Sequence, residues 1–260
     1  MMVFTLCGAI GPSIALTLSH SDAERFGIVF VLTLLTAILT FAVSFLLPSG
    51  KKTAEAEPQQ KTERVELHDH MTLATLVFTI LTFLLAFGQS AVVACLNLYA
   101  LDYGMGNLSM FFVVFAVFNC ITRLFMNTIL QMFSERVVLI VITGMSLFVY
   151  AGIYLAHQAV VLYLLAIPYG VSMGFFYPLL TTKTIRTMSK LRQGTSNSIY
   201  LGAEDVAFFL GAVFWTAISG VLGGYRQIYL AAAGIATVML VLVLGYPALL
   251  KKYHVKEDVW

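Results

Sequence analysis

The amino-acid sequence predicts an all-α polytopic membrane protein with eight transmembrane helices. Of its 260 residues, 60% are hydrophobic and only 11% are charged, and the mean hydropathy is +0.90. A soluble domain carries about 25% charged residues, so a water-soluble core could not hide this much apolar surface. Eight apolar stretches approach or exceed the roughly 20 residues that a membrane-spanning helix needs. Lipid is therefore the expected solvent.

The first two candidate spans lie in residues 1–48. Residues 3–19 form a short apolar stretch, and residues 28–47 form a second one without any charged side chain. No Lys or Arg precedes Arg25, whereas a secretory signal peptide opens with a positively charged region. We therefore expect residues 3–19 to be a membrane span and not a cleaved leader.

A polar segment, residues 49–70, separates these two spans from the rest of the chain. It carries nine charged side chains of both signs, together with Pro58, Gln59 and Gln60. Such a composition is typical of a solvated linker. The sequence thus predicts two spans, a charged cytoplasmic linker, and then six more spans.

Six further apolar stretches fill residues 71–250. Residues 71–101 are too long for one upright helix and contain Gly88, Gln89 and Ser90, so we expect a tilted or kinked span. Residues 137–182 are uncharged over about 69 Å at 1.5 Å per residue, enough for two spans with a turn at residues 156–158. The other stretches are residues 107–130, 197–222 and 228–250, and residues 251–260 form a cytoplasmic tail.

Basic residues mark one side of the predicted membrane. If the N-terminus is cytoplasmic, the loops and tail on that side carry twelve Lys and Arg residues, against only Arg25 and Arg226 on the other side. Cytoplasmic loops are enriched in Lys and Arg. We therefore expect both termini in the cytoplasm and a multi-pass location in a bacterial-type cytoplasmic (plasma) membrane. The twelve residues are Lys51, Lys52, Lys61, Arg64, Arg136, Lys183, Arg186, Lys190, Arg192, Lys251, Lys252 and Lys256.

A family resemblance begins between the fourth and fifth predicted spans. The stretch RLFMNTILQMFSER at residues 123–136 resembles the loop signature RPxxGxLxDRxGRR of the major facilitator superfamily (MFS). Arg123 and Arg136 match the signature, whereas two glycines and an aspartate are replaced. Decay of this signature is usual in the C-terminal half of the family, so the resemblance implies that half. The replacing residues are Asn127, Gln131 and Ser134.

Two further motifs extend the resemblance. The stretch GVSMGFFYP at residues 170–178, followed by a basic loop with Gly194, is similar to the family's tenth span and the loop after it. The stretch GAIGPSIA, which contains Gly8, Gly11 and Pro12, is similar to a fifth-span glycine-proline motif associated with exporters. The resemblance then covers spans five to twelve of a twelve-span member, with four N-terminal spans absent and a complete C-terminal six-helix half.

The resemblance implies secondary active transport, with substrate bound near the midplane between two six-helix halves and access alternating by rocking. The exporter-like motif favours proton-coupled efflux, and spans rich in aromatic residues and Met favour small, largely apolar substrates. No cofactor is expected, because the proton gradient would supply the energy for transport. The expected partners are a small-molecule substrate, the lipid bilayer and a missing N-terminal half.

The family's seventh and tenth spans line its central cavity, and they correspond to the third and sixth spans predicted here. A buried amide in a membrane protein more often makes an interhelical hydrogen bond, which is the alternative role for each candidate. The cavity candidates, one of them from the fourth span, are Gln89, Asn97, Tyr99, Tyr169, Tyr177 and Asn119.

Three charged residues inside predicted spans carry the strongest functional signal. Glu204 and Asp205 lie about two turns inside the seventh span, where a charge is costly. Successive helical residues point about 100° apart, so the two carboxylates face different neighbours. One of them could take up the coupling proton, or both could pair with basic residues at the cytoplasmic rim. Arg123 is expected in the cytoplasmic gate, as in the family, or else extends to the lipid headgroups.

Small residues recur at helical spacing on two spans. In lipid, small residues let helix backbones approach closely, so we expect helix packing, with a role in gating as the alternative. Prolines within spans are expected to kink their helices. The residues of these motifs are Gly170, Gly174 and Pro178 on the sixth span and Ala203, Ala207 and Gly211 on the seventh.

Two other classes of function remain open. An inactive or accessory remnant would need a separate partner half, because an eight-span piece lacks half of the cavity. A polytopic membrane enzyme is the remoter alternative, because the sequence has no HExxH, Asp-rich diphosphate or GxSxG motif and its five histidines are scattered. No catalytic residue, metal site or nucleic-acid partner is expected.

Overall fold

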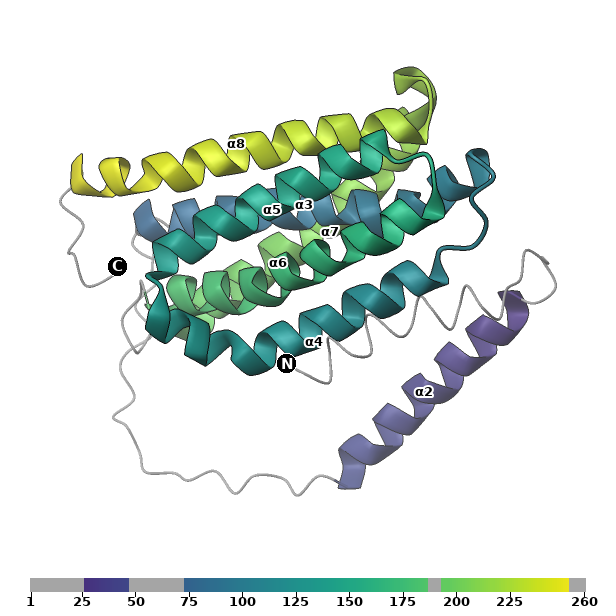
Figure 1. Cartoon of the computed structure of the whole chain (residues 1–260). Coiled ribbons are helices and arrows are strands. Elements are labelled where there is room, and N and C mark those ends of the chain that lie inside the picture. The colour runs from purple at the N-terminus through teal and green to yellow at the C-terminus, as the bar shows by residue number, and fades with distance from the viewer. Residues whose placement is uncertain (1–25, 47–72, 187–192, 253–260) are drawn as a thin grey trace.

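The computed structural model describes residues 26–46, 73–186 and 193–252, and the long elements within these ranges are all α-helices (Figure 1). The prediction of an all-α protein is confirmed for this part of the chain. The helices are α2 (Phe26–Leu46), α3 (Leu73–Asp102), α4 (Ser109–Met132), α5 (Glu135–Leu155), α6 (Ala159–Arg186), α7 (Gln193–Leu222) and α8 (Tyr225–Lys252).

Six of these helices, α3 to α8, are long and apolar enough to cross a membrane. The prediction of eight spans is therefore corrected to six among the described residues. The second predicted span coincides with α2, of which the described side chains include the apolar stretch Val31–Val43. The first predicted span, residues 3–19, lies outside the described residues.

The helix boundaries follow local chemistry. Ser134 is the N-cap of α5 and accepts a hydrogen bond from the Val137 N–H at 3.4 Å, and Glu135 places an acid at the positive end of the helix. α5 ends at Leu155, because Ala156 is extended, and α6 begins at Ala159. The turn predicted at residues 156–158 is thereby confirmed.

α3 runs as one 30-residue helix through the predicted interruption at residues 88–90. At 1.5 Å per residue it is about 45 Å long, more than the roughly 30 Å of hydrocarbon in a bilayer. A helix of this length must tilt or project beyond the membrane core, as the sequence predicted for this stretch.

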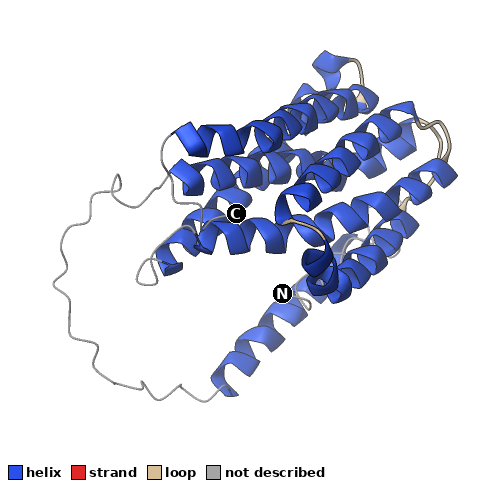
Figure 2. Cartoon of the chain, turned by 60° about the vertical axis from the view of Figure 1, so that its left-hand side comes forward, coloured by secondary structure: helices blue, strands red, loops and turns tan. Residues whose placement is uncertain are grey.

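The six long helices form one bundle, seen from two sides in Figures 1 and 2. α3 packs against α6, α7 and α8, α4 packs against α6, and α5 packs against α6 and α8. The packing repeats between the helices α3–α5 and the helices α6–α8. α3 packs against α7 and α8 of the second set, and α6 packs in the same way against α4 and α5 of the first set. The bundle thus consists of two three-helix units with equivalent packing partners.

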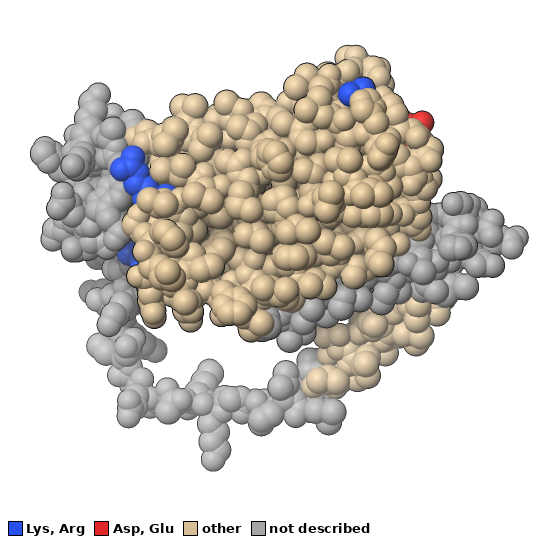
Figure 3. All heavy atoms as spheres, viewed as in Figure 1, with Lys and Arg blue, Asp and Glu red and all other residues tan. Residues whose placement is uncertain are grey.

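The surface of the bundle suits lipid. Large apolar side chains such as Phe148, Leu164 and Phe209 are more than 60% exposed. On the face shown in Figure 3, the coloured Lys, Arg, Asp and Glu atoms lie near the two ends of the bundle, and the belt between them is uncharged. Water would penalise such a belt, whereas a bilayer core would accept it. The exposed α2 side chains Leu34 and Leu39 have the same apolar character.

Candidate functional site

Arg123 and Asn119 lie one turn apart on α4, so both face the same side of the helix. Asn119 is 3% exposed, and its Oδ1 accepts a hydrogen bond from Arg123 Nε at 3.1 Å. This bond directs the guanidinium toward the preceding turn and away from the end of α4 at Met132. The geometry favours the gate interpretation of Arg123 over extension to the headgroups.

The two adjacent carboxylates of α7 have different surroundings. Glu204 is half-buried and interacts electrostatically with Arg123 of α4, whereas Asp205 is exposed. Tyr200, one turn before Glu204, is 1% exposed and therefore marks the side of α7 that faces the bundle. The structure separates two groups that the sequence could not rank: Glu204 faces other helices and Asp205 faces outward.

Tyr177 connects three helices near Glu204. Its hydroxyl on α6 donates a hydrogen bond to Gln89 Oε1 on α3, and its carbonyl accepts one from the Tyr200 hydroxyl on α7 at 3.3 Å. Tyr177 also interacts electrostatically with Glu204 and Arg123. The resulting group, which we call the polar cluster, consists of Gln89, Asn119, Arg123, Tyr177, Tyr200 and Glu204.

The other three cavity candidates lie elsewhere. Asn97 Oδ1 accepts a hydrogen bond from the Leu108 N–H at 3.5 Å in the α3–α4 turn. Tyr99 is 0% exposed and its hydroxyl donates to the carbonyl of Ala156 in the α5–α6 turn. Tyr169 is 2% exposed. Asn97 therefore sits at a turn, and the two tyrosines sit inside this bundle and not on a surface that a second half could cover.

The glycine motif of α6 marks a close approach to α4. A Cβ atom on Gly170 would lie 2.6 Å from the Phe115 carbonyl oxygen, and one on Gly174 would lie 2.8 Å from Thr122 Cβ. These contacts fit the helix-packing interpretation. Pro178 lies inside α6, where its missing N–H leaves the carbonyl of the preceding turn without its helical hydrogen bond.

The small residues of α7 face α3. A Cβ atom on Gly211 would lie 3.0 Å from the Phe87 carbonyl oxygen, and Ala207 is fully buried, whereas Ala203 is half-buried. One turn beyond Gly211, Trp215 Nε1 donates a hydrogen bond to the same Phe87 carbonyl at 2.8 Å. The α3–α7 pair thus combines a close backbone approach with a direct side-chain bond to the backbone.

An ion-pair cluster at the end of the bundle was missed from the sequence. Lys183 on α6 is 3% exposed and its Nζ lies 2.5 Å from Glu135 Oε2 on α5, while Arg186 Nη1 lies 3.5 Å from Glu135 Oε1. Lys183 Nζ also lies 6.0 Å from the centre of the Phe78 ring on α3. The sequence did contain a signal for this cluster. Glu135 stands where the loop signature has a basic residue, so the charge at that position is reversed.

Gly8, Gly11 and Pro12, the residues of the exporter-like motif, lie outside the described residues. Within the described ranges, no group of three or more His, Cys, Asp or Glu side chains is arranged to hold a metal ion.

The family model described as the Major Facilitator Superfamily matches residues 1–212, most of the chain. The chain belongs to the major facilitator superfamily. No curated protein matches it. The predicted family is confirmed, and because members of this superfamily are transporters, the chain is a multi-pass MFS transporter. The match includes the degenerate loop signature at residues 123–136 and every member of the polar cluster.

Proposed function

We propose that this MFS transporter couples proton movement to the efflux of small, largely apolar molecules, and that Glu204 carries the coupling proton. The observation that supports this proposal is the position of Glu204. It is an acid within a membrane-spanning helix, half-buried, and placed against Arg123 and the polar cluster. Inserting a charged carboxylate into a membrane costs several kcal/mol, so an acid that is retained there indicates a functional role.

Protonation of Glu204 would change how four helices hold together. As an anion, Glu204 attracts Arg123 and so draws α7 toward α4. As a neutral acid it loses this attraction, while Tyr177 still links α6 to α3 and α7. A ligand shifts a conformational equilibrium only through different affinities for the two states, and a proton on Glu204 meets that condition. The proton could thereby favour one side of alternating access.

The substrate class follows from the character of the spans. The chain has 20 Phe, 12 Tyr and 11 Met residues but few charges. A site lined by such side chains favours amphiphilic or apolar molecules over sugars or dicarboxylates. The distribution of Lys and Arg supports a bacterial-type cytoplasmic membrane with both termini in the cytoplasm.

The test uses the full chain in proteoliposomes with an imposed proton gradient. Uptake of the lipophilic dyes Hoechst 33342 and ethidium is followed by fluorescence, and trapped pyranine reports the opposite movement of protons. We expect Glu204→Gln to abolish gradient-driven dye movement but to retain dye-for-dye exchange, which requires no change in protonation. Asp205→Asn is the matched control, because it alters the adjacent, outward-facing carboxylate and should keep both activities.

Two results would contradict the proposal. Gradient-driven transport that keeps its rate and pH dependence in Glu204→Gln would exclude Glu204 as the coupling group. Wild-type protein that is folded but moves neither dye nor protons would favour the alternative, in which the chain is an accessory remnant that requires a separate partner half.

A further inference from the structure

Six tyrosines form a file through the interior of the bundle. They come from five of the six long helices, and all except the half-buried Tyr177 are at most 3% exposed. We call this group the tyrosine column. In order from the end that carries the α5–α6 turn, it consists of Tyr99, Tyr229, Tyr150, Tyr169, Tyr177 and Tyr200.

The column reaches the surface at the end of α3. Tyr103 is 49% exposed, and its ring centre lies 5.0 Å from that of the fully buried Tyr99. The ring of Tyr229 on α8 follows, with its centre 5.6 Å from that of Tyr99. Both buried hydroxyls donate to backbone carbonyls, Tyr99 to Ala156 and Tyr229 to Ala91. Each hydroxyl oxygen therefore keeps acceptor capacity for another proton.

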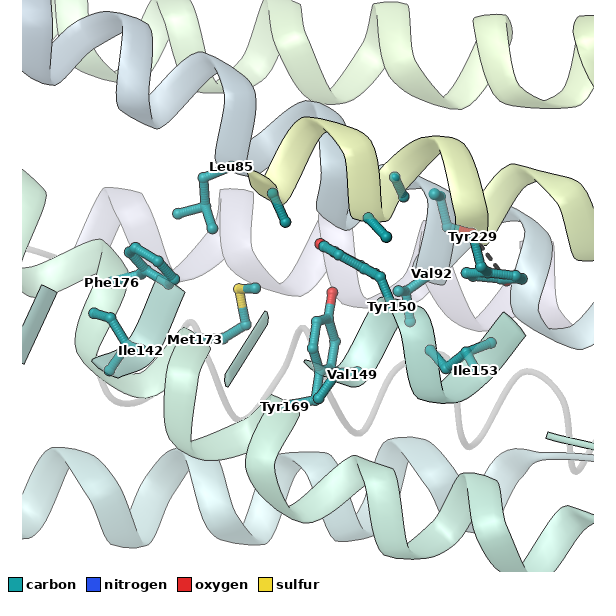
Figure 4. Close-up of a cluster of buried hydrophobic side chains, with 14 of the residues drawn as sticks. Leu85, Val92, Ile142, Val149, Tyr150, Ile153, Tyr169, Met173, Phe176 and Tyr229 are labelled. Carbon is teal, nitrogen blue, oxygen red and sulfur yellow. Dashed lines mark hydrogen bonds between the residues drawn. The ribbon is translucent and has the colours of Figure 1, made fainter. Parts of the chain in front are cut away.

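In the middle of the bundle, Tyr150 of α5 faces Tyr169 of α6. Their ring centres lie 6.3 Å apart, and in Figure 4 the two hydroxyls point toward one another between α5 and α6. The Tyr169 hydroxyl is buried without a hydrogen bond of ordinary geometry among the described residues, and it interacts with the Tyr150 hydroxyl. Gly88 of α3 leaves room at this point, because a Cβ atom there would lie 3.1 Å from the Tyr150 hydroxyl oxygen. A buried hydroxyl without an ordinary hydrogen bond is costly, so its retention calls for a reason.

The column ends at the polar cluster. The Tyr177 hydroxyl binds Gln89, and the Tyr200 hydroxyl binds the Tyr177 carbonyl at 3.3 Å. Tyr200 precedes Glu204 by one turn of α7, so both side chains lie on the same side of that helix. Among the described residues, the titratable and charged groups around Glu204 are Arg123 from α4, Tyr177 from α6, and Tyr200 and Asp205 from α7 itself.

We propose that the tyrosine column is the route by which protons reach Glu204 from the end of the bundle that carries the α5–α6 turn. Each hydroxyl would accept a proton from one side and release its own to the other. The net change is one proton lost from water near Tyr103 and one gained by the Glu204 carboxylate, with every tyrosine restored. The interval from Tyr169 to Tyr177 is about 12 Å along α6 at 1.5 Å per residue, so transfer there requires intervening water. This inference rests on the proposed coupling role of Glu204.

The test follows protonation directly and needs no substrate. The full chain is placed in proteoliposomes of one orientation, with the α5–α6 turn outside, as verified by labelling a cysteine at the exposed Gln158. The external pH is stepped from 8 to 5.5, and infrared spectroscopy records the protonated-carboxyl band that Glu204→Gln removes. We expect Tyr150→Phe combined with Tyr169→Phe to slow the appearance of this band at least about tenfold, equivalent to about 1.4 kcal/mol of activation free energy.

Controls separate a proton route from a structural effect. Tyr246→Phe removes the hydroxyl of another buried tyrosine, which packs on Phe78 away from the column, and should leave the rate unchanged. If the double variant does not fold, Tyr169→Phe alone is used. Its hydroxyl has no hydrogen bond of ordinary geometry and interacts only weakly with Tyr150, so its removal should leave the fold intact.

The outcomes distinguish this inference from the function on which it rests. An unchanged rate in the tyrosine variants, with the Glu204 band present, would overturn the column as a route and leave the coupling role intact. The absence of any band that depends on Glu204 would overturn the coupling role and the column together.

Discussion

Replacement of Gly170 with alanine should force α6 away from α4. The added Cβ would lie 2.6 Å from the Phe115 carbonyl oxygen and 3.1 Å from the Asn119 backbone nitrogen, and backbone atoms cannot swing aside as a flexible side chain can. Restoring ordinary contact at about 3.5 Å requires the helices to separate by roughly 1 Å. Overpacking of this kind costs about 1–3 kcal/mol.

The same substitution also has a favourable part, because alanine is a better helix former than glycine by about 1 kcal/mol. Gly144→Ala on α5 isolates that part, since nothing lies within 4 Å of a Cβ atom at Gly144. The difference in stability between the two variants is then the steric cost alone. We expect Gly144→Ala to be slightly more stable than the wild type and Gly170→Ala to be less stable than Gly144→Ala by about 1–3 kcal/mol.

The measurement is the free energy of unfolding in mixed micelles titrated with sodium dodecyl sulfate and followed by circular dichroism. Equal stabilities of the two alanine variants would refute the reasoning. They would mean that α4 and α6 are farther apart at this point than the structure shows, and the glycines would then need an explanation other than close packing.

Two further predictions use the same measurement. Glu135→Gln should cost about 1–3 kcal/mol, less than a fully buried pair because Glu135 is 27% exposed, and the added change Lys183→Met should recover most of the loss; a double variant no more stable than the single one would refute the pairing. Trp215→Phe removes the hydrogen bond to the Phe87 carbonyl and should cost about 1 kcal/mol, whereas no loss would mean that the bond contributes nothing.

Much of the fold could be read from the sequence because lipid imposes a simple rule. In an all-α membrane protein, each stretch that crosses hydrocarbon must be helical and mostly apolar. The six spans in residues 71–250 and the turn at residues 156–158 follow from that rule and are confirmed. The two N-terminal spans stay predictions, because residues 3–19 lie outside the described residues and α2 is described as an apolar stretch only over Val31–Val43.

The site was less predictable, since composition does not tell which side of a helix meets which neighbour. The cavity candidates Gln89, Asn119 and Tyr177 fall in the polar cluster, and their cavity role stays a prediction. Tyr99, another candidate, instead holds the α5–α6 turn. Tyr200 was not predicted as a site residue, because nothing in the sequence distinguishes it from the other eleven tyrosines. Its position one turn before Glu204 follows from the spacing, but its hydrogen bond to the Tyr177 carbonyl depends on how α7 packs.

The sequence alone determined the solvent, the helical class, the positions of six spans and the family, because each depends on local composition or on a short motif. The tertiary structure alone gave Glu204 and Asp205 different surroundings, paired Glu135 with Lys183, and brought buried tyrosines from five helices into one bundle. These features depend on the rotation of each helix about its axis. That rotation is fixed by close contacts such as those at Gly170 and Gly211, which join residues far apart in the chain.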